Sequence, residues 1–304
     1  MRADFRRQYY KSLGVAKTDV SLPVEFMINS ETLGMLCALF CPFISSQLIE
    51  TPPADVSVLR KTCAHALLPS DLQWQVWELV LGVVPAERDA RAFVRDERQQ
   101  RYEDLRAIAR VLVPCDDILR WAQNETTIDI DTTSSGYRLM HAYVSQLRLS
   151  QSSQGHFDHW TSLTSNSLRF LYTLASHLSL SLSSESDCFS LFTAFLYHKC
   201  GRHSLPFLES QTEMSASLGM EAFEKCLSHS FTGILSNRTI DYFLHVVICD
   251  EKVRNWPLFV RRMVEAIGPK TLLVASPSKL LVIEDEYLLI QNALAAYEKS
   301  LSNA

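Results

Sequence analysis

Apolar residues recur every three or four positions through most of this chain, and this period constrains the fold more than any other feature. It is the spacing of one helix face, whereas the two-residue alternation of a half-buried strand is scarce. The run LSLSLS at 178–183 does alternate, but its flanks favour the end of a helix over a strand. We therefore predict an all-α protein of many helices, with helical segments at 136–149, 167–182, 187–201, 220–235, 238–250, 255–267 and 276–301.

A further helix is predicted to begin at Ser70. Ser70 and Gln73 have the spacing of a capping box, in which the glutamine amide satisfies a free backbone group at the helix start. The apolar residues behind them fall on one face, and Pro85 is predicted to end the helix because it cannot donate a hydrogen bond inside it. That face consists of Leu72, Val76, Leu79, Val80 and Val83.

The pattern of apolar and charged residues in the segment 87–113 predicts one long amphipathic helix or two. Its apolar residues can share a buried stripe, and the charges between them predict a solvated face with ion pairs four residues apart. The predicted stripe consists of Phe93, Val94, Tyr102, Leu105, Ile108, Ala109 and Leu112.

Length and charge exclude several classes of protein. The 304 residues, 47% of them apolar, suffice for one large domain with a sizeable core, and we predict a single domain over 1–304. The formal net charge of −5 gives no general attraction to phosphate, so no nucleic-acid partner is expected. The polar stretches near 123–135 and 150–155 are predicted to be loops within the domain.

Cysteine usage and the N-terminus indicate a cytoplasmic protein. The eight cysteines include no CxxC pair, which favours reduced thiols buried as small hydrophobes, and the sequon at Asn237 is then a chance match. The basic N-terminus has no apolar run behind it, unlike a signal peptide. The apolar run 33–44 contains Pro42 and is shorter than the roughly 20 residues of a transmembrane helix. A buried helix is expected there, and an exposed patch that docks on a partner or a membrane surface is the alternative.

No motif of the sequence predicts a catalytic or cofactor centre by itself. Glycine-rich phosphate loops and the GxSxG elbow are absent. His198, Cys200 and His203 are potential metal ligands, but a helix end with a glycine stop explains them better, because no second ligand pair completes a zinc site. His156 and His159 also lack a further ligand. We expect neither a metal nor a cofactor.

The stretch LLPSDLQWQVWELVLG resembles the first signature of the TBC domain, the fold of Rab GTPase-activating proteins. That signature runs glycine, isoleucine, proline, three residues, arginine, two residues, valine and tryptophan, and then leucines. Pro69, Val76, Trp77 and Gly82 match it, whereas its first glycine is missing and Gln73 stands at the arginine position. The resemblance implies a multi-helix TBC domain in which these five residues are structural.

Other segments are similar to later parts of the family's domain. The stretch RQQRYEDL resembles the helix that follows the signature, and 184–196 resembles the family's acidic-aromatic helix. The segment 223–250 resembles the late helix pair, whose pattern ends in a tryptophan and an aspartate, and Tyr242 and Asp250 lie in that region. The segment 26–53 is longer than the family pattern and is predicted to be an insertion.

The resemblance also implies which catalytic groups to look for. Active members supply an arginine finger in an IxxDxxR pattern and a water-orienting glutamine in a YxQG pattern. The chain contains no YxQG, and its one DxxR near the expected place, formed by Asp117 and Arg120, has Pro114 where the isoleucine belongs. We expect Asp117 and Arg120 to form a local ion pair, so no catalytic residue is predicted. Arg120 with Gln146 is the weak alternative pair.

These departures imply a non-catalytic binding subunit. The segments 5–15, 67–85 and 186–196 resemble the subgroup that belongs to the tuberous sclerosis complex. This implies a coiled-coil partner, hamartin, and through it tuberin, which promotes GTP hydrolysis by Rheb and so restrains TOR signalling. The alternatives are a GTPase-activating protein for a Rab-family GTPase and an unrelated helical protein. The expected location is the cytoplasm, with peripheral attachment to lysosomal or vesicle membranes through the complex.

Overall fold

The computed structural model describes residues 49–50, 54–64, 68–113, 130–152, 165–182, 184–200, 225–226, 231, 234–253, 256–268 and 286–302. Every regular element within these ranges is a helix, which confirms the predicted all-α class. In chain order the elements are α3 (Val56–Cys63), α4 (Ser70–Val80), α5 (Ala90–Leu112), α7 (Ser135–Ser152), α8 (Ser165–Ser181), α9 (Glu185–Phe195), the π-helix η3 (Leu196–Cys200), α11 (Asn237–Cys249), α12 (Trp256–Ile267) and α14 (Glu286–Ser302).

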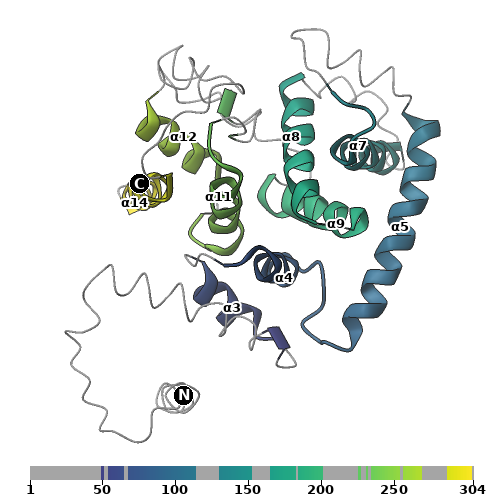
Figure 1. Ribbon diagram of the computed structural model, residues 1–304, viewed down its shortest axis with the longest axis horizontal. Coiled ribbons are helices and arrows are strands. Elements are labelled where there is room, and N and C mark those ends of the chain that lie inside the picture. Colours follow the sequence, from purple (N-terminus) through teal and green to yellow (C-terminus); the bar gives the residue numbers. More distant parts are fainter. Residues whose placement is uncertain are drawn as a thin grey trace, which may run out of the picture.

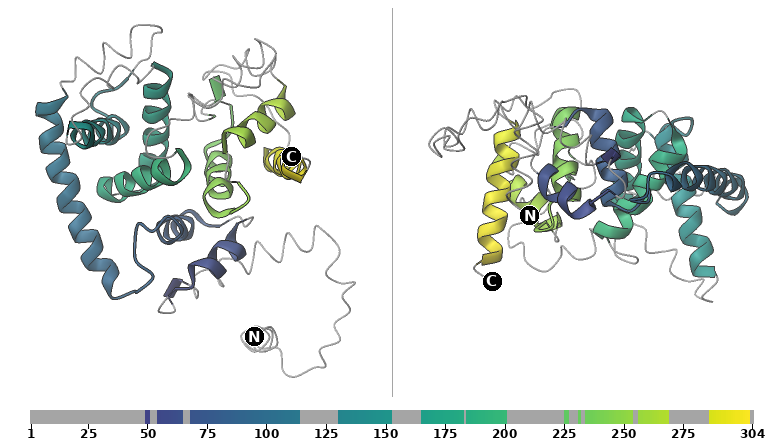
Figure 2. Two further views of the ribbon diagram at one scale, coloured as in Figure 1. Left: turned by 180° about the vertical axis from the view of Figure 1, so that it is seen from behind. Right: turned by 90° about the horizontal axis from the view of Figure 1, so that it is seen from below.

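Two groups of helices meet around α4 (Figure 1). In one group α7 packs against α5, α8 and α9, and in the other α14 packs against α11 and α12. The helix α3 packs on both α4 and α11. Figure 2 shows α5 and α14 on opposite sides of the described helices in space. Their buried side chains belong to one hydrophobic core, in which Trp77, Tyr297 and Phe170 are among the largest fully buried residues.

The helix α4 ends earlier than the sequence predicts. It stops at Val80, because Gly82 adopts the left-handed conformation with φ of +67°. The N–H of Val83 donates to Glu78 O at 2.7 Å and that of Gly82 to Leu79 O at 3.2 Å, which is the Schellman pattern. The glycine therefore terminates the helix before the chain reaches Pro85, and the prediction that the proline ends it is wrong.

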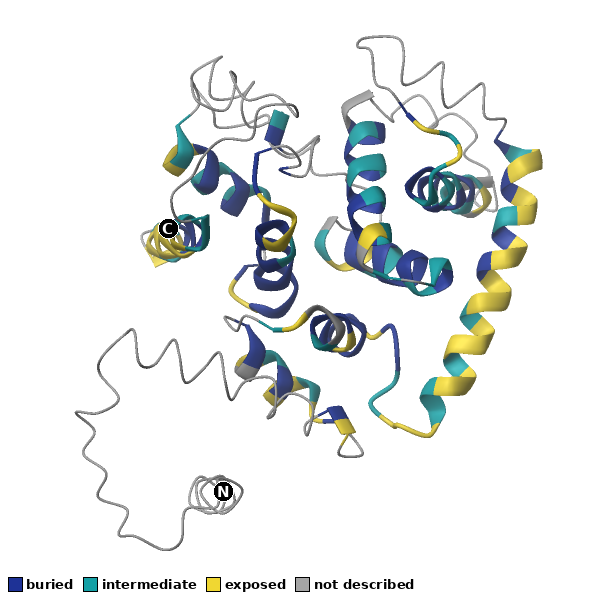
Figure 3. Cartoon of the chain, in the orientation of Figure 1, coloured by how far each residue is buried: buried dark blue, intermediate teal, exposed yellow. Residues whose placement is uncertain are grey.

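The helix α5 is a single helix, and its buried stripe is narrower than predicted. Tyr102, Leu105 and Ala109 are buried, but Phe93 is 67% exposed and Ile108 is 40% exposed. The prediction fails at these two positions because α5 lies at the edge of the molecule, where most of its surface faces water (Figure 3).

The polar segment 130–134 is non-helical, as predicted, and it caps α7. The hydroxyl of Ser134 accepts the N–H of Tyr137 at 3.1 Å, which satisfies a free donor at the helix start. Ser135 is already helical, and α7 continues to Ser152, so the predicted loops are wrong at 135 and at 150–152. At 150–152 serine and glutamine extend a helix that is already nucleated, and no glycine or proline interrupts it there.

A glycine allows α7 and α8 to cross closely. A Cβ atom at Gly136 would lie 2.6 Å from the Cα and 2.1 Å from the Oγ of Ser176. Because one of these atoms belongs to the backbone of α8, no rotation of a side chain could relieve the clash. The crossing sets the position of α7, which carries part of the junction described below.

The remaining helix predictions have mixed outcomes. The first part of the alternating run, 178–181, is the end of α8, as its flanks indicate. The helix predicted at 220–235 does not extend to residue 235. Phe231 has a left-handed φ of 59°, which interrupts a helix, and its N–H donates to Cys226 O at 3.0 Å. None of the described helices combines the length and the apolar character needed to cross a membrane.

Several predictions fall outside the described residues. These are the apolar run 33–44, almost all of the predicted insertion 26–53, the pair Asp117 and Arg120, the histidines at 156 and 159, and the start of the last predicted helix at 276–285.

Candidate functional site: the signature helix and its junctions

The signature residues lie on α4 and on the turns at its two ends. Pro69 is the N-cap residue and is exposed, and Gly82 forms the C-terminal turn. Val76 and Trp77 are 0% and 1% exposed and face the core. The helix therefore joins the two groups of helices through its apolar face.

Gln73 binds another helix and does not cap its own. The N-cap residue of α4 is Pro69 and not Ser70, which is already helical, and Nε2 of Gln73 donates to the backbone oxygen of Asp241 on α11 at 2.8 Å. The prediction of a capping box is therefore wrong. Gln73 is buried, and its side chain extends towards α11 because the signature helix packs on α11 at this point.

Asp241 is also bound by a third helix. Its Oδ1 lies 2.9 Å from Nε2 of His177 on α8, and a carboxylate only accepts, so the imidazole N–H donates. The Gln73–Asp241–His177 contacts join α4, α11 and α8. Sequence analysis missed Asp241 and His177, because neither belongs to a short motif and the two are 64 residues apart.

The two residues that the late-helix resemblance singled out both follow Asp241 in the sequence, one directly and one at the end of α11. Tyr242 is buried, and its hydroxyl accepts a hydrogen bond from Gln291 on α14. Asp250 is the C-cap residue of α11, and its Oδ1 accepts the N–H of Lys252 at 2.9 Å. Neither of these two hydrogen bonds involves Gln73.

Trp77 forms a second contact between α4 and α11. Its indole N–H donates to Nδ1 of His245 at 2.9 Å, and Nε2 of the same ring lies 2.6 Å from the carbonyl oxygen of Cys63 on α3. Because the indole only donates, His245 carries its proton on Nε2 and donates it to Cys63. This chain of two hydrogen bonds satisfies polar groups that are fully removed from water.

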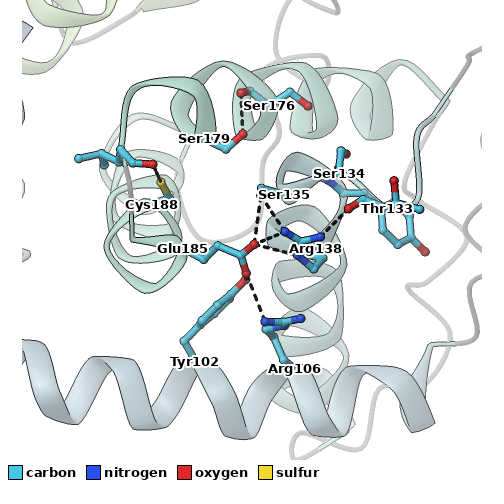
Figure 4. Close-up of polar contacts among 12 residues, drawn as sticks. Tyr102, Arg106, Thr133, Ser134, Ser135, Arg138, Ser176, Ser179, Glu185 and Cys188 are labelled. Atoms are coloured by element: carbon cyan, nitrogen blue, oxygen red, sulfur yellow. Dashed lines mark hydrogen bonds and ion pairs between the residues drawn. The ribbon is translucent and has the colours of Figure 1, made fainter.

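Glu185 forms the centre of a different junction, at the start of α9 (Figure 4). Its carboxylate accepts hydrogen bonds from side chains of α5 and α7, including Nε of Arg138 at 2.8 Å, Ser135 at 3.0 Å and Tyr102 at 3.2 Å. Arg106 lies 3.3 Å away and forms an ion pair. The Glu185 side chain remains 26% exposed, so this charged junction is in contact with water.

The neighbours of Glu185 determine its pKa. Burial by itself would raise the pKa, but the hydrogen bonds from Arg138 and Ser135 and the charges of both arginines favour the carboxylate and lower the pKa overall. The hydrogen bond with Glu185 raises the pKa of Arg138. Burial and the nearby Glu185 charge raise the pKa of Tyr102 well above its usual range. All three groups are therefore held in their ordinary charge states.

Arginines attach the first half of α5 to the rest of the molecule. Arg91 donates to the carbonyl oxygens of Ile49, Pro85 and Ala86, each at 3.1 Å, and Arg98 donates to that of Gly82 at 3.3 Å. Between them, Arg95 forms an ion pair of 2.7 Å with Glu78 of α4. Burial raises the pKa of Glu78, although Arg95 opposes this.

The described chain shows no activated nucleophile at these junctions. The Sγ of Cys249 lies 3.8 Å from Nδ1 of His245, but Nδ1 already accepts the indole N–H. Burial raises the pKa of Cys249 to about 12, which keeps it as a thiol. Burial also lowers the pKa of Lys199, to about 8, but Nζ of Lys199 donates only a long hydrogen bond of 3.5 Å to Val253 O.

The weak alternative residues are not brought together by the described part of the structure. Arg120 lies outside it, and Gln146 lies on α7 with a buried amide oxygen that has no hydrogen-bond partner among the described residues. His198 is exposed on η3, and no cluster of three metal-ligating side chains occurs within the described ranges.

Comparison with known proteins identifies the fold. No protein-family model matches the chain, and no curated protein matches it. Among solved structures, the chain is similar to the Ypt/Rab-GAP domain of Gyp1p, with a TM-score of 0.53 and 12% sequence identity over 86% of this chain and 99% of that one. At this identity the match concerns the arrangement of helices alone. The chain therefore has the all-α fold of a Ypt/Rab-GAP domain, the TBC fold.

Proposed function

We propose that this protein is a non-catalytic adaptor that uses a TBC-like fold as a binding surface. The observation that carries the proposal is Gln73, which replaces the signature arginine and uses its amide for an interior contact with α11. The sequence also contains no YxQG motif from which a water-orienting glutamine could come. The first departure removes an arginine that the resemblance implies to be structural, and the second removes a group that the family's activity requires.

Loss of the catalytic arginine finger and of the water-orienting glutamine is costly, and the IxxDxxR pattern of the finger is also incomplete here, with Pro114 at the isoleucine position. An arginine supplied in trans to a GTPase accelerates hydrolysis by roughly 10³–10⁵, which corresponds to about 4–7 kcal/mol of transition-state stabilisation. A positioned glutamine acts together with it, because orientation and charge stabilisation provide nearly all of the catalysis. The buried amide oxygen of Gln146 supports the proposal, since a residue that orients water must reach the solvent-filled site.

We propose further that the protein binds the same kind of partner as the small TBC subunit of the tuberous sclerosis complex, member seven of the family. That partner is a hamartin-like coiled coil, bound helix in groove, and through it tuberin. In this proposal the chain supports activation of Rheb GTPase by the complex, and so the restraint of TOR signalling, at the cytoplasmic side of lysosomal or vesicle membranes. The proposal rests on the similar segments 5–15, 67–85 and 186–196.

A binding assay run beside an activity assay tests the proposal. The purified chain is incubated with the coiled-coil segment of a hamartin-like protein, and GTP hydrolysis is measured on a panel of Rab GTPases with and without the chain. We expect binding without acceleration. Failure to bind the segment would contradict the choice of partner, and acceleration of any panel member would contradict the non-catalytic role.

The second candidate is a GTPase-activating protein for a Rab-family GTPase. The fold similarity to the Ypt/Rab-GAP domain of Gyp1p favours it, since that domain is described by this activity. Arg120→Ala separates the candidates, because a finger would lose nearly all acceleration on this change. In the adaptor, a surface ion pair contributes roughly 0–1 kcal/mol, and the variant should fold and bind as the wild type does.

A further inference from the structure

The helix α5 turns one continuous face to water along its whole length. The positions 93, 97, 100, 104, 108 and 111 are three or four residues apart and so form a single ridge. We call this ridge the outer face of α5, and all of its residues are exposed (Figure 3). It consists of Phe93, Glu97, Gln100, Asp104, Ile108 and Val111.

The outer face has apolar residues towards its two ends. Phe93 is 67% exposed and Val111 is 81% exposed, and Ile108 beside Val111 is 40% exposed. At a rise of about 1.5 Å per residue, Phe93 and Val111 are roughly 27 Å apart. A single exposed apolar side chain needs no explanation, but two apolar sites in register on one ridge are the pattern of a helix that packs against a partner.

The middle of the outer face is acidic. Its two charged residues are Glu97 and Asp104, both carboxylates, and the exposed Asp96 lies roughly 80° around the helix from the centre of the ridge. The exposed Arg101 lies roughly 60° around the helix from the centre of the ridge, and the exposed Arg110 lies roughly 120° around it on the other side. Both arginines therefore flank the ridge, and a partner that covers it would meet negative charge between two apolar contacts.

The inner side of the same helix is firmly attached. Arg91, Arg95 and Arg98 bind α4 and the segments before and after it, and Arg106 pairs with Glu185. Tyr102 donates to the same Glu185 carboxylate. The outer face is thus presented on a helix that is already ordered, which lowers the entropic cost of binding.

We infer that the outer face of α5 is the docking surface for an amphipathic partner helix that carries apolar residues at both ends and lysines or arginines between them. The inference rests on the proposed function, since it locates the surface through which the adaptor holds a helical partner. A helix of about five turns spans the ridge. Its basic residues would face Glu97 and Asp104 while its ends cover Phe93 and Val111.

The charge of the ridge disfavours two other occupants. A second copy of the same face would place like charges opposite one another, and an anionic lipid surface would meet the same repulsion. Both remain outcomes of the test, because self-association and vesicle binding can be measured directly.

A designed peptide tests the inference with the full chain. The probe is a labelled helical peptide of about 21 residues with leucines at both ends and lysines between them, and binding is followed by fluorescence anisotropy. We expect Val111→Asp to weaken binding by about tenfold, and the charge reversal Glu97→Lys with Asp104→Lys to weaken it by a similar factor at low salt. Leu180→Asp is the matched control, because Leu180 on α8 is 75% exposed and lies away from the ridge.

A charge-swapped peptide makes the test reciprocal. A peptide with glutamates in place of the lysines should bind the reversed variant better than it binds the wild type. Equal binding of the basic peptide to the wild type and to Val111→Asp, or no binding to either, would overturn the inference. So would dimerisation of the wild type, or capture by anionic vesicles, that Val111→Asp abolishes.

The coiled-coil segment separates this inference from the proposed function. If the segment binds the wild type and Val111→Asp equally, the adaptor role stands and the outer face is the wrong surface. If the segment fails to bind while the basic peptide binds in a Val111-dependent way, the docking surface stands and the proposed partner is wrong. Every variant is first compared with the wild type by circular dichroism and thermal midpoint.

Discussion

The Trp77–His245–Cys63 junction of α4, α11 and α3 and the junction at Glu185 each join three helices, but they do so with different chemistry. At the first, Trp77 and His245 are each 1% exposed and their hydrogen bonds involve neutral groups. At the second, a carboxylate that is 26% exposed accepts from two arginines, a tyrosine and a serine. The first junction is closed to water, and the second is open to it.

This difference assigns separate roles to the two junctions. A buried hydrogen-bond chain is costly to break, because each group left without a partner cannot turn to water. A half-exposed charge cluster is more tolerant, since water replaces a lost partner and salt screens the remaining charges. We therefore expect the first junction to determine whether the chain folds and the second to adjust how firmly α5 is held.

The largest expected effect is that of Trp77→Ala. The change removes a buried aromatic side chain and leaves Nδ1 of His245 without its donor, so the free energy of unfolding should fall by about 3–5 kcal/mol. Urea denaturation followed by circular dichroism measures this loss. Trp77→Phe, which keeps most of the ring but not the N–H, should lose less. A soluble, fully folded Trp77→Ala variant with an unchanged midpoint would contradict the assignment of Trp77 to the core.

Gln73→Arg tests whether the interior still accommodates the signature arginine. The site is buried and holds an uncharged amide that donates to a backbone oxygen, and the Asp241 carboxylate already accepts from His177, so the guanidinium would be only partly paired and the variant should lose about 2 kcal/mol. Combining it with His177→Gln frees the carboxylate and should recover part of the loss in a double-mutant cycle. A Gln73→Arg variant at least as stable as the wild type would show that the lost arginine had no structural conflict here.

Glu185→Gln tests the open junction. The amide keeps the size of the side chain but removes the charge that Arg138 and Arg106 bind, so we expect a loss of about 1–2 kcal/mol at neutral pH. The same unfolding assay in high salt should show a smaller difference between variant and wild type. A loss as large as that of Trp77→Ala would contradict the distinction between the two junctions.

The pH dependence should distinguish the junctions without a large change in stability. The pKa of Glu185 is lowered on folding from its ordinary 4.5, so its contribution is complete above that value and is lost as the pH falls through the lowered pKa. The difference in unfolding free energy between wild type and Glu185→Gln should therefore shrink below about pH 4.5. The corresponding difference for Trp77→Phe should stay constant over the same range, and a parallel decline would contradict the neutral character of the first junction.

Glu78→Gln should have the smallest effect, and its pH dependence should have the opposite sign. Burial raises the pKa of Glu78 on folding, so any stability it contributes is present at low pH and is lost as the pH rises through the raised pKa. At neutral pH the change to a neutral amide should alter stability by less than about 1 kcal/mol. The amide avoids the cost of burying a charged carboxylate, and this gain offsets the loss of the ion pair with Arg95. Equilibrium unfolding from acid to neutral pH measures the sign of this pH dependence. If the stability that Glu78→Gln loses relative to the wild type grew with pH, burial would not be the dominant influence on the Glu78 pKa.

The sequence by itself determined the fold class, most helix positions and the signature helix. The 3.6-residue period is a local property, and it predicted the helices around Trp77, Tyr102 and Phe259 because each must bury one face. The resemblance of the stretch around Pro69 and Trp77 led to the TBC fold, which the similarity to the Gyp1p domain supports.

Only the tertiary structure decided which polar residues meet. Gln73 satisfied the local rule for a capping box, yet its amide binds Asp241, which is 168 residues away. The edge position of α5 left Phe93 exposed although its spacing fits the buried stripe. The physical reason is the same in both cases: spacing along a helix determines which residues share a face, but the packing of distant helices determines what that face contacts.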